Sequence, residues 1–137
     1  NGNRFLERLL ASIGTIEKYC KEKKVVKIEI VIVNDSPDVA VELPKKFKTK
    51  NNIKIINNKK NLGIHGARVN GLKNAQGDWI LFLDQDDELI VDGFKEQIEL
   101  TKDSDVVVGN GFFQRNGKNI KIYDNISVMN YLIQKKN

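Results

Sequence analysis

Two short runs of apolar residues constrain the fold of this chain more than any other feature. Residues 28–33 and 79–83 are almost continuously apolar, and the first run is rich in β-branched side chains. Strands of this kind are covered on both faces, as in the parallel sheets of α/β proteins. Each run ends directly in a polar turn, at residues 34–38 and 84–88. Because ligands of such sheets bind beyond the carboxyl ends of the strands, we expect both turns at the functional edge.

Segments before and between these runs have the periodicity of helices. Apolar residues recur at steps of three and four over residues 4–23, which predicts an amphipathic helix. An inner stripe formed by Ile64, Ala67, Gly71 and Ala75 predicts a second helix over residues 64–75 that lies close on the sheet. The other expected elements are strands at 53–56 and 106–108, helices at 92–102 and 126–135, and a hairpin around Asn116-Gly117. The sequence therefore predicts an α/β, Rossmann-like and mostly parallel sheet flanked by helices, with a hairpin near the C-terminus.

The composition fits one domain and restricts the kinds of ligand that the domain can bind. With 137 residues the chain has room for a single domain, and Cys20, its one cysteine, excludes an intrachain disulfide. The net charge is +5, but the surplus is mainly lysine without interleaved aromatic residues, which argues against a nucleic-acid partner. No run approaches the roughly 18 apolar residues of a membrane span. We expect a cytoplasmic domain whose charge favours an anionic ligand and allows peripheral association with the inner face of a membrane.

The acidic turn at 84–88 is the strongest chemical signal. Four acids in five residues repel one another, and a divalent cation is the simplest compensation, since Mg²⁺ takes one or two carboxylates and completes its shell with phosphate oxygens. An EF-hand is excluded because its sixth position, a glycine, would be Leu89. Two interpretations stay open: a haloacid-dehalogenase-like phosphohydrolase with Asp84 as nucleophile, and metal-assisted handling of a nucleotide diphosphate.

A longer pattern resembles the donor-binding half of family 2 glycosyltransferases, which have the GT-A fold. Its parts are Asn-Leu-Gly at 61–63, Ala-Arg at 67–68 and Asp-Gln-Asp-Asp at 84–87, after the upstream Val-Asn-Asp-Ser-Pro-Asp at 33–38. The order and spacing of these blocks agree with the family over roughly residues 1–110. The resemblance implies a GT-A-like fold, a nucleoside-diphosphate sugar as donor, and a glycan, lipid-linked or protein acceptor.

The same resemblance implies a role for each matched residue. Asp35 would accept hydrogen bonds from the base of the donor, usually uracil, and Arg68 would lie over the base or diphosphate. Asp84 would contact the ribose or the metal. Asp86 would coordinate Mn²⁺ or Mg²⁺ bridging the diphosphate, with Asp87 in support. Glu88, beside these acids, is interpreted as a bystander.

The sequence departs from the family pattern in two places. Ser36 and Pro37 replace a glycine turn after Asp35, and Val69 replaces an asparagine, with Asn70 next to it. The chain also begins where the family's first strand should already have ended, and no acid after Tyr123 matches the family's general base. We therefore expect residues 1–137 to be a single, partial GT-A donor-binding domain of an inverting enzyme, whose general base lies outside this chain. A non-catalytic nucleotide- or metal-binding module is the alternative of a different class.

Overall fold

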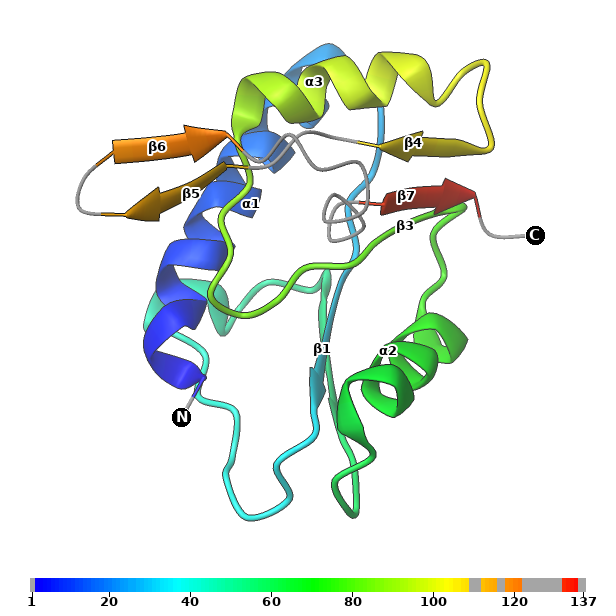
Figure 1. Ribbon diagram of the computed structural model, residues 1–137. Helices are drawn as coiled ribbons and strands as arrows, with labels where there is room; N and C mark the ends of the chain where they lie inside the picture. The colour runs from blue at the N-terminus through cyan, green and yellow to red at the C-terminus, as the bar shows by residue number, and fades with distance from the viewer. Residues whose placement is uncertain (1, 109–111, 116–117, 122–131, 136–137) are drawn as a thin grey trace. The chain divides into compact units, whose positions relative to one another are not determined.

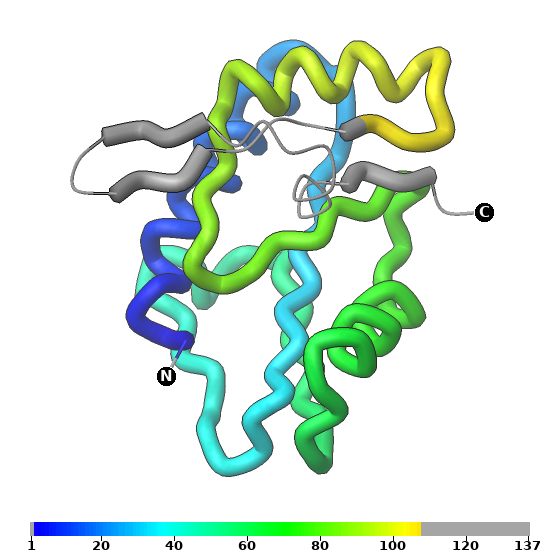
Figure 2. The backbone as a smooth tube through the Cα atoms, in the orientation of Figure 1, coloured from blue at the N-terminus to red at the C-terminus, as the bar shows by residue number. Residues whose placement is uncertain are grey.

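The computed structural model describes residues 2–108, 112–115, 118–121 and 132–135 of the chain (Figure 1; Figure 2). The chain divides into two compact units. The first unit consists of Asn1–Gly77 together with Gln85–Leu89, and the second of Asp78–Asp84 together with Ile90–Asn137. The predicted acidic turn therefore begins in the second unit and continues in the first.

A parallel pair of strands forms the centre of the first unit. The elements of this unit are α1 (Asn3–Lys23), β1 (Ile30–Asn34), the 3₁₀ helix η1 (Lys45–Phe47), β2 (Ile53–Asn57) and α2 (Gly63–Asn74). β1 and β2 pair in parallel, from Ile30 opposite Ile53 to Asn34 opposite Asn57, and α2 packs against β1 (Figure 1). This small parallel sheet confirms the α/β class and both predicted strands, apart from shifts at their ends.

The first helix buries the apolar stripe that its periodicity predicts. Its buried residues are Leu6, Leu9, Leu10, Ile13, Ile16 and Cys20. Three- and four-residue steps place all of them on one face of the helix. Burial raises the pKa of the Cys20 thiol, so this cysteine is a small core side chain rather than a reactive thiolate.

The second helix lies close to β1 because Gly71 has no side chain. A Cβ atom at Gly71 would lie only 3.2 Å from Cγ2 of Val33. At the other end of α2, Gly63 has a φ of 72°, a conformation that glycine adopts readily. The predicted inner stripe is wrong at its first position, since Ile64 is 74% exposed. Ile64 lies in the first turn of α2, about two turns before the glycine that faces β1.

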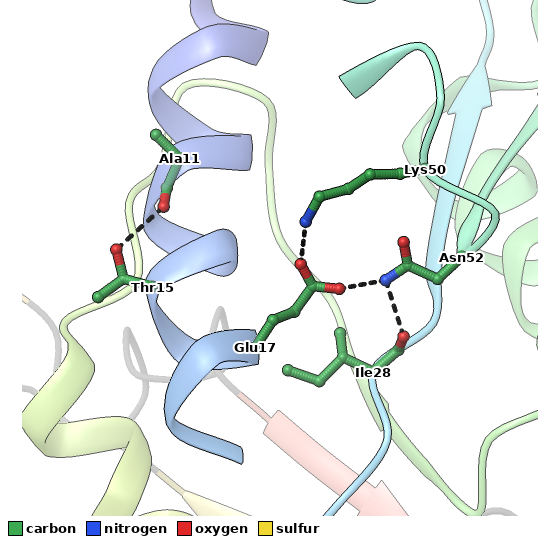
Figure 3. A network of polar contacts seen from close by, with 6 residues as sticks. All are labelled: Ala11, Thr15, Glu17, Ile28, Lys50 and Asn52. Carbon is green, nitrogen blue, oxygen red and sulfur yellow. Dashed lines mark hydrogen bonds and ion pairs between the residues drawn. The ribbon is translucent and has the colours of Figure 1, made fainter. Parts of the chain in front are cut away.

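Side-chain hydrogen bonds join α1 to the segments that lead into both parallel strands (Figure 3). The Glu17 carboxylate accepts hydrogen bonds from Nζ of Lys50 and Nδ2 of Asn52. The same Asn52 amide donates to the carbonyl oxygen of Ile28 at 3.0 Å. The Glu17 and Lys50 side chains are 19% and 32% exposed, so their ion pair is screened less than a fully exposed pair. Glu17 thus fixes α1 at the amino-terminal edge of the sheet.

The second unit is built from short antiparallel strands and one helix. Its elements are β3 (Trp79–Leu81), α3 (Val91–Leu100), β4 (Val106–Val108), β5 (Phe112–Arg115), β6 (Lys118–Lys121) and β7 (Leu132–Lys135). β7 lies between β3 and β4 and pairs antiparallel with both. β5 and β6 form a separate antiparallel pair.

Three expectations change in this unit. The predicted helix at 126–135 is wrong over residues 132–135, which form β7, while residues 126–131 lie outside the described residues. The short strands β3 and β4 explain this difference, because β7 lies between them and gives each an antiparallel hydrogen-bonding partner. The sheet is therefore not mostly parallel, because among the described strands only β1 and β2 pair in parallel. The predicted hairpin is not shown as a whole, since its turn at 116–117 lies outside the described residues.

No helix in the described part of the chain has both the length and the apolar character needed to cross a membrane. The longest of the described helices is α1, with 21 residues.

Replacing Glu17 with alanine should lower the free energy of unfolding by about 1–2 kcal/mol, because Lys50 and Asn52 lose a shared acceptor. Urea denaturation measures this change. Glu22→Ala removes a carboxylate from an exposed position of the same helix and should change stability by less than about 0.5 kcal/mol. Equal effects of the two substitutions would contradict the anchoring role of Glu17.

Replacing Gly71 with leucine should lower the unfolding free energy by about 1–3 kcal/mol, because the new side chain forces α2 away from Val33. Gly14→Leu is the matched control, since a Cβ at Gly14, also in a helix, meets no atom within 4 Å. Thermal denaturation of both variants tests the close approach. Leucine has the higher helix propensity and should by itself stabilise both helices, so an equally strong destabilisation of Gly14→Leu would contradict the close approach at Gly71 as the cause.

Candidate functional site

The carboxylate of Asp35 is bound by its own chain directly after β1. Its Oδ1 accepts hydrogen bonds from Nδ2 of Asn58 at 2.7 Å and from the backbone N–H of Leu62 at 2.8 Å. The Leu62 N–H lies 3.0 Å from Oδ2 as well. The hydrogen bond from the Asn58 side chain, followed by that from the Leu62 backbone, lowers the pKa of Asp35. The aspartate is therefore held ionised at the carboxyl edge of the parallel pair.

A chain of side-chain amides connects Asp35 to α2. Asn58 is 7% exposed, and its Oδ1 accepts a hydrogen bond from Nδ2 of Asn70 at 2.6 Å. Nδ2 of Asn74 in turn donates to the backbone oxygen of Asn70 at 3.0 Å and to its Oδ1 at 3.1 Å. A buried amide needs partners for both its oxygen and its nitrogen, and Asn58 has both. The polar contact of Asn70, one residue beyond the family position, is therefore with Asn58.

Asn34 shapes the turn that carries Asp35. Its Nδ2 donates to the carbonyl of Val39 at 2.7 Å and to Oδ1 of Asn57 at 3.0 Å. Its Oδ1 accepts from the N–H of Ser36 at 3.1 Å, which is an Asx-type turn. The asparagine thus closes the loop after β1 and links it to the end of β2.

Sequence reasoning missed Asn58, although a signal was present. Asn57-Asn58 follows the second strand as Asn34-Asp35 follows the first. In a parallel pair the two dipeptides must meet at one edge, and the register places Asn34 opposite Asn57. A polar pair repeated after two neighbouring strands was therefore enough to predict a contact between Asp35 and Asn58.

Arg68 belongs to α2, the helix that receives this amide chain. Its side chain is half-buried and has an interaction of its own. Asp35 and Arg68 thus lie in one compact unit, on a strand end and on the helix that packs against that strand.

Side chains of α1 bind the segment Gln85–Leu89, which contains most of the acidic turn. Nη2 of Arg8 donates to the backbone oxygen of Asp86 at 3.0 Å, and Nε of Arg8 lies 3.3 Å from Oε2 of Glu88. Oγ of Ser12 accepts the N–H of Leu89 at 3.2 Å. Arginine therefore compensates part of the acidic charge. The Glu88 carboxylate is thus paired with Arg8 at an exposed position.

The predicted metal ligands lie on this turn and just before it. The Asp86 side chain is exposed, Asp87 is half-buried, and Asp84, in the other unit, is exposed. Among the described residues, no group of three or more His, Cys, Asp or Glu side chains is placed to hold a metal ion. Carboxylate oxygens nevertheless fit Mg²⁺ or Mn²⁺, and a site that takes one or two of them with phosphate oxygens needs no closed protein cage.

The first unit thus defines a class of protein: an α/β domain with an ionised carboxylate at the carboxyl edge of its parallel strands. Comparison with known proteins gives this class its family. The sequence matches the family described as "Glycosyl transferase family 2" over residues 3–136. The chain belongs to this family, as its sequence motifs predict. The match gives no support to the haloacid-dehalogenase-like interpretation.

Three curated relatives illustrate the range of similar proteins. Glycosyltransferase GlyA of Streptococcus pneumoniae is 30% identical over 124 residues, covering 78% of this chain and 18% of the relative. An uncharacterized glycosyltransferase of Haemophilus influenzae is 30% identical over 118 residues, covering 82% and 47%. The minor teichoic acid biosynthesis protein GgaB of Bacillus subtilis is 42% identical over 74 residues, covering 52% and 8%. The chain therefore spans less than half the length of each of these relatives.

Replacing Asn58 with alanine should raise the pKa of Asp35 toward its ordinary value, because the largest source of the lowering is removed. The stability that Asp35 contributes is present above its unfolded-state pKa and is lost as the pH falls through the lower folded-state value. In Asn58→Ala this contribution should be smaller, and its loss should be complete at a higher pH. An NMR titration of the Asp35 carboxyl carbon measures the shift.

Asn74→Ala is the control for this titration, since Asn74 belongs to the same amide chain but contacts Asn70 and not Asp35. Its Asp35 pKa should stay near that of the unaltered protein. Identical titration curves for Asn58→Ala and the unaltered protein would show that the carboxylate is held by the backbone amides of Leu62 and Gly63 without help from Asn58.

Proposed function

We propose that this chain carries the donor-binding part of a glycosyltransferase that transfers a sugar from a nucleoside diphosphate, with UDP-sugar as the preferred donor class, to an acceptor with inversion. One observation carries the proposal: in a chain of family 2, a carboxylate is held ionised at the carboxyl edge of the parallel strands. Ligands of open α/β sheets bind at this edge.

In this proposal Asp35 binds the base of the donor. An ionised carboxylate is only an acceptor and has about four lone-pair positions. Oδ1 accepts two of the hydrogen bonds, from Asn58 and Leu62, while Oδ2 shares the Leu62 N–H, and the Gly63 amide adds a further backbone contact to the carboxylate. The carboxylate therefore keeps capacity for the N–H of a pyrimidine base. Arg68, a permanent cation on the adjacent helix, supports the base or the diphosphate.

Asp86 is proposed to bind Mn²⁺ or Mg²⁺, with Asp84 and Asp87 in support. A bound divalent ion supplies a Lewis acid that neutralises charge on the departing nucleoside diphosphate. The contribution of the chain itself is to present the Asp86 carboxylate from a turn whose backbone is held by Arg8 and Ser12. Glu88 is excluded from the proposed ligand set because it pairs with Arg8.

The acceptor side of the reaction is proposed to lie elsewhere in the protein. Inversion by single displacement needs a base that deprotonates the acceptor hydroxyl, and no residue of this chain is assigned to that role. The proposed acceptor is a glycan, a lipid-linked acceptor or a protein. Because GgaB is named for minor teichoic acid biosynthesis, assembly of a cell-surface polysaccharide is the proposed process, with peripheral association at the inner face of the membrane.

Calorimetric titration of the chain with UDP, with and without Mn²⁺, tests the donor site. UDP should bind more tightly with Mn²⁺, and Asp86→Asn should remove this gain, a loss of about tenfold in affinity. Asp35→Asn should instead weaken UDP binding in both conditions, because the base contact does not depend on the metal.

Asp105→Asn is the matched control for Asp86→Asn, because Asp105 is an exposed aspartate outside the acidic turn. It should bind UDP like the unaltered chain. Equal Mn²⁺ dependence in the Asp86 and Asp105 variants would refute the metal role of Asp86. Absence of labelled-sugar transfer by the protein that contains this chain, despite UDP binding, would favour a non-catalytic nucleotide-binding module.

A further inference from the structure

The segment Gln85–Leu89, which belongs to the first unit, follows the surface of α1 over about three helical turns. A Cβ atom at Gly2 would lie 1.9 Å from Oε1 of Gln85, so the Gln85 side chain lies directly against Gly2. Arg8 contacts Asp86 and Glu88, and Ser12 contacts Leu89. Positions 8 and 12 are neighbours on one helix face because they are four residues apart. The turn and the helix therefore run in the same direction, in contact at successive points.

Arg8 binds a different group in each of two acidic residues of the turn, Asp86 and Glu88. Its guanidinium binds the backbone oxygen of Asp86 but the side-chain carboxylate of Glu88. The Asp86 carboxylate, in contrast, has no hydrogen bond or ion pair within the part of the chain that the structure describes. A planar guanidinium has several donors in a fixed fork, so one arginine can hold both groups at once.

We propose that Arg8 is a positioning residue that sorts the acids of this turn: it fixes the backbone of Asp86 and keeps Glu88 away from the metal. The inference rests on the proposed function, since it assigns the metal to Asp86. Without Arg8, Glu88 is a free carboxylate two residues from Asp86 on a less restrained backbone. Free Mn²⁺ then gains a ligand, while the geometry that serves the metal–nucleotide complex is lost.

This role predicts opposite changes in two affinities when Arg8 is replaced. Loss of a merely structural residue would change both affinities in the same direction. Arg8→Met should bind free Mn²⁺ about threefold to tenfold more tightly but bind UDP in the presence of Mn²⁺ about tenfold more weakly. In Arg8→Met with Glu88→Gln, the gain for free Mn²⁺ should disappear and the loss for UDP should persist. Arg8→Lys keeps the charge without the fork. Its affinity for free Mn²⁺ should therefore equal that of the unaltered chain, whereas its affinity for UDP should stay as weak as in Arg8→Met. Titrations of Mn²⁺ followed by electron paramagnetic resonance give the first affinity, and calorimetry gives the second.

A second readout requires no metal and no nucleotide. The N–H of Leu89 donates to Ser12, so its hydrogen exchange reports whether the turn stays on α1. Exchange should be about threefold to tenfold faster in Arg8→Met than in the unaltered chain. Arg4→Met is the matched control, because Arg4 lies on the same helix but over the ring of Phe5, and it should leave exchange and both affinities unchanged.

The outcomes distinguish the two proposals. If Arg8→Met matches Arg4→Met in exchange and in Mn²⁺ affinity, the positioning role is overturned. If Glu88→Gln does not cancel the gain for free Mn²⁺, the sorting of acids is overturned. If the unaltered chain shows no Mn²⁺-dependent binding of UDP, the proposed function fails, and with it the metal-sorting role, whereas faster Leu89 exchange would still establish that Arg8 holds the turn.

Discussion

The parallel register of β1 and β2 is the constraint on which the candidate site depends. It places Asn34 opposite Asn57, and the residues that follow, Asp35 and Asn58, then meet as acceptor and donor. An antiparallel pairing would send the two strand ends to opposite edges. Because Asn58 also accepts from Asn70, the same register determines how the loop after β2 returns to α2.

The two edges of this parallel pair are held by different chemistry. At the amino-terminal edge the charged Glu17 and Lys50 form the connection. At the carboxyl edge neutral amides surround Asp35. Neutral donors stabilise the Asp35 carboxylate without cancelling its charge. A lysine at the same place would form an ion pair with the carboxylate and neutralise it. The edge with amides is therefore the one that keeps its charge available to a ligand.

Local pattern was sufficient for some of the structure and not for the rest. The stripe of α1, the positions of β1, β2 and β4, and the close approach at Gly71 follow from periodicity and residue size. The strand at Leu132–Lys135 does not, because an isolated segment of this kind also fits a helix, and the free edges of β3 and β4 decide its state. Asn58 could have been predicted from strand pairing. Arg8 could not, because its partner Asp86 is 78 residues away and periodicity does not indicate which turn a polar helix face binds.

The distance in sequence between Arg8 and the acidic turn has a consequence for how the first unit is assembled during synthesis. α1, β1, β2 and α2 are all made before residue 77, and they can pack as soon as they leave the ribosome. The segment that completes the unit arrives later, after β3 has been made. Contacts between residues so far apart form late because closing a long loop costs chain entropy. The polar face of α1 at Arg8 and Ser12 is therefore exposed to water until the segment that it binds has been synthesised.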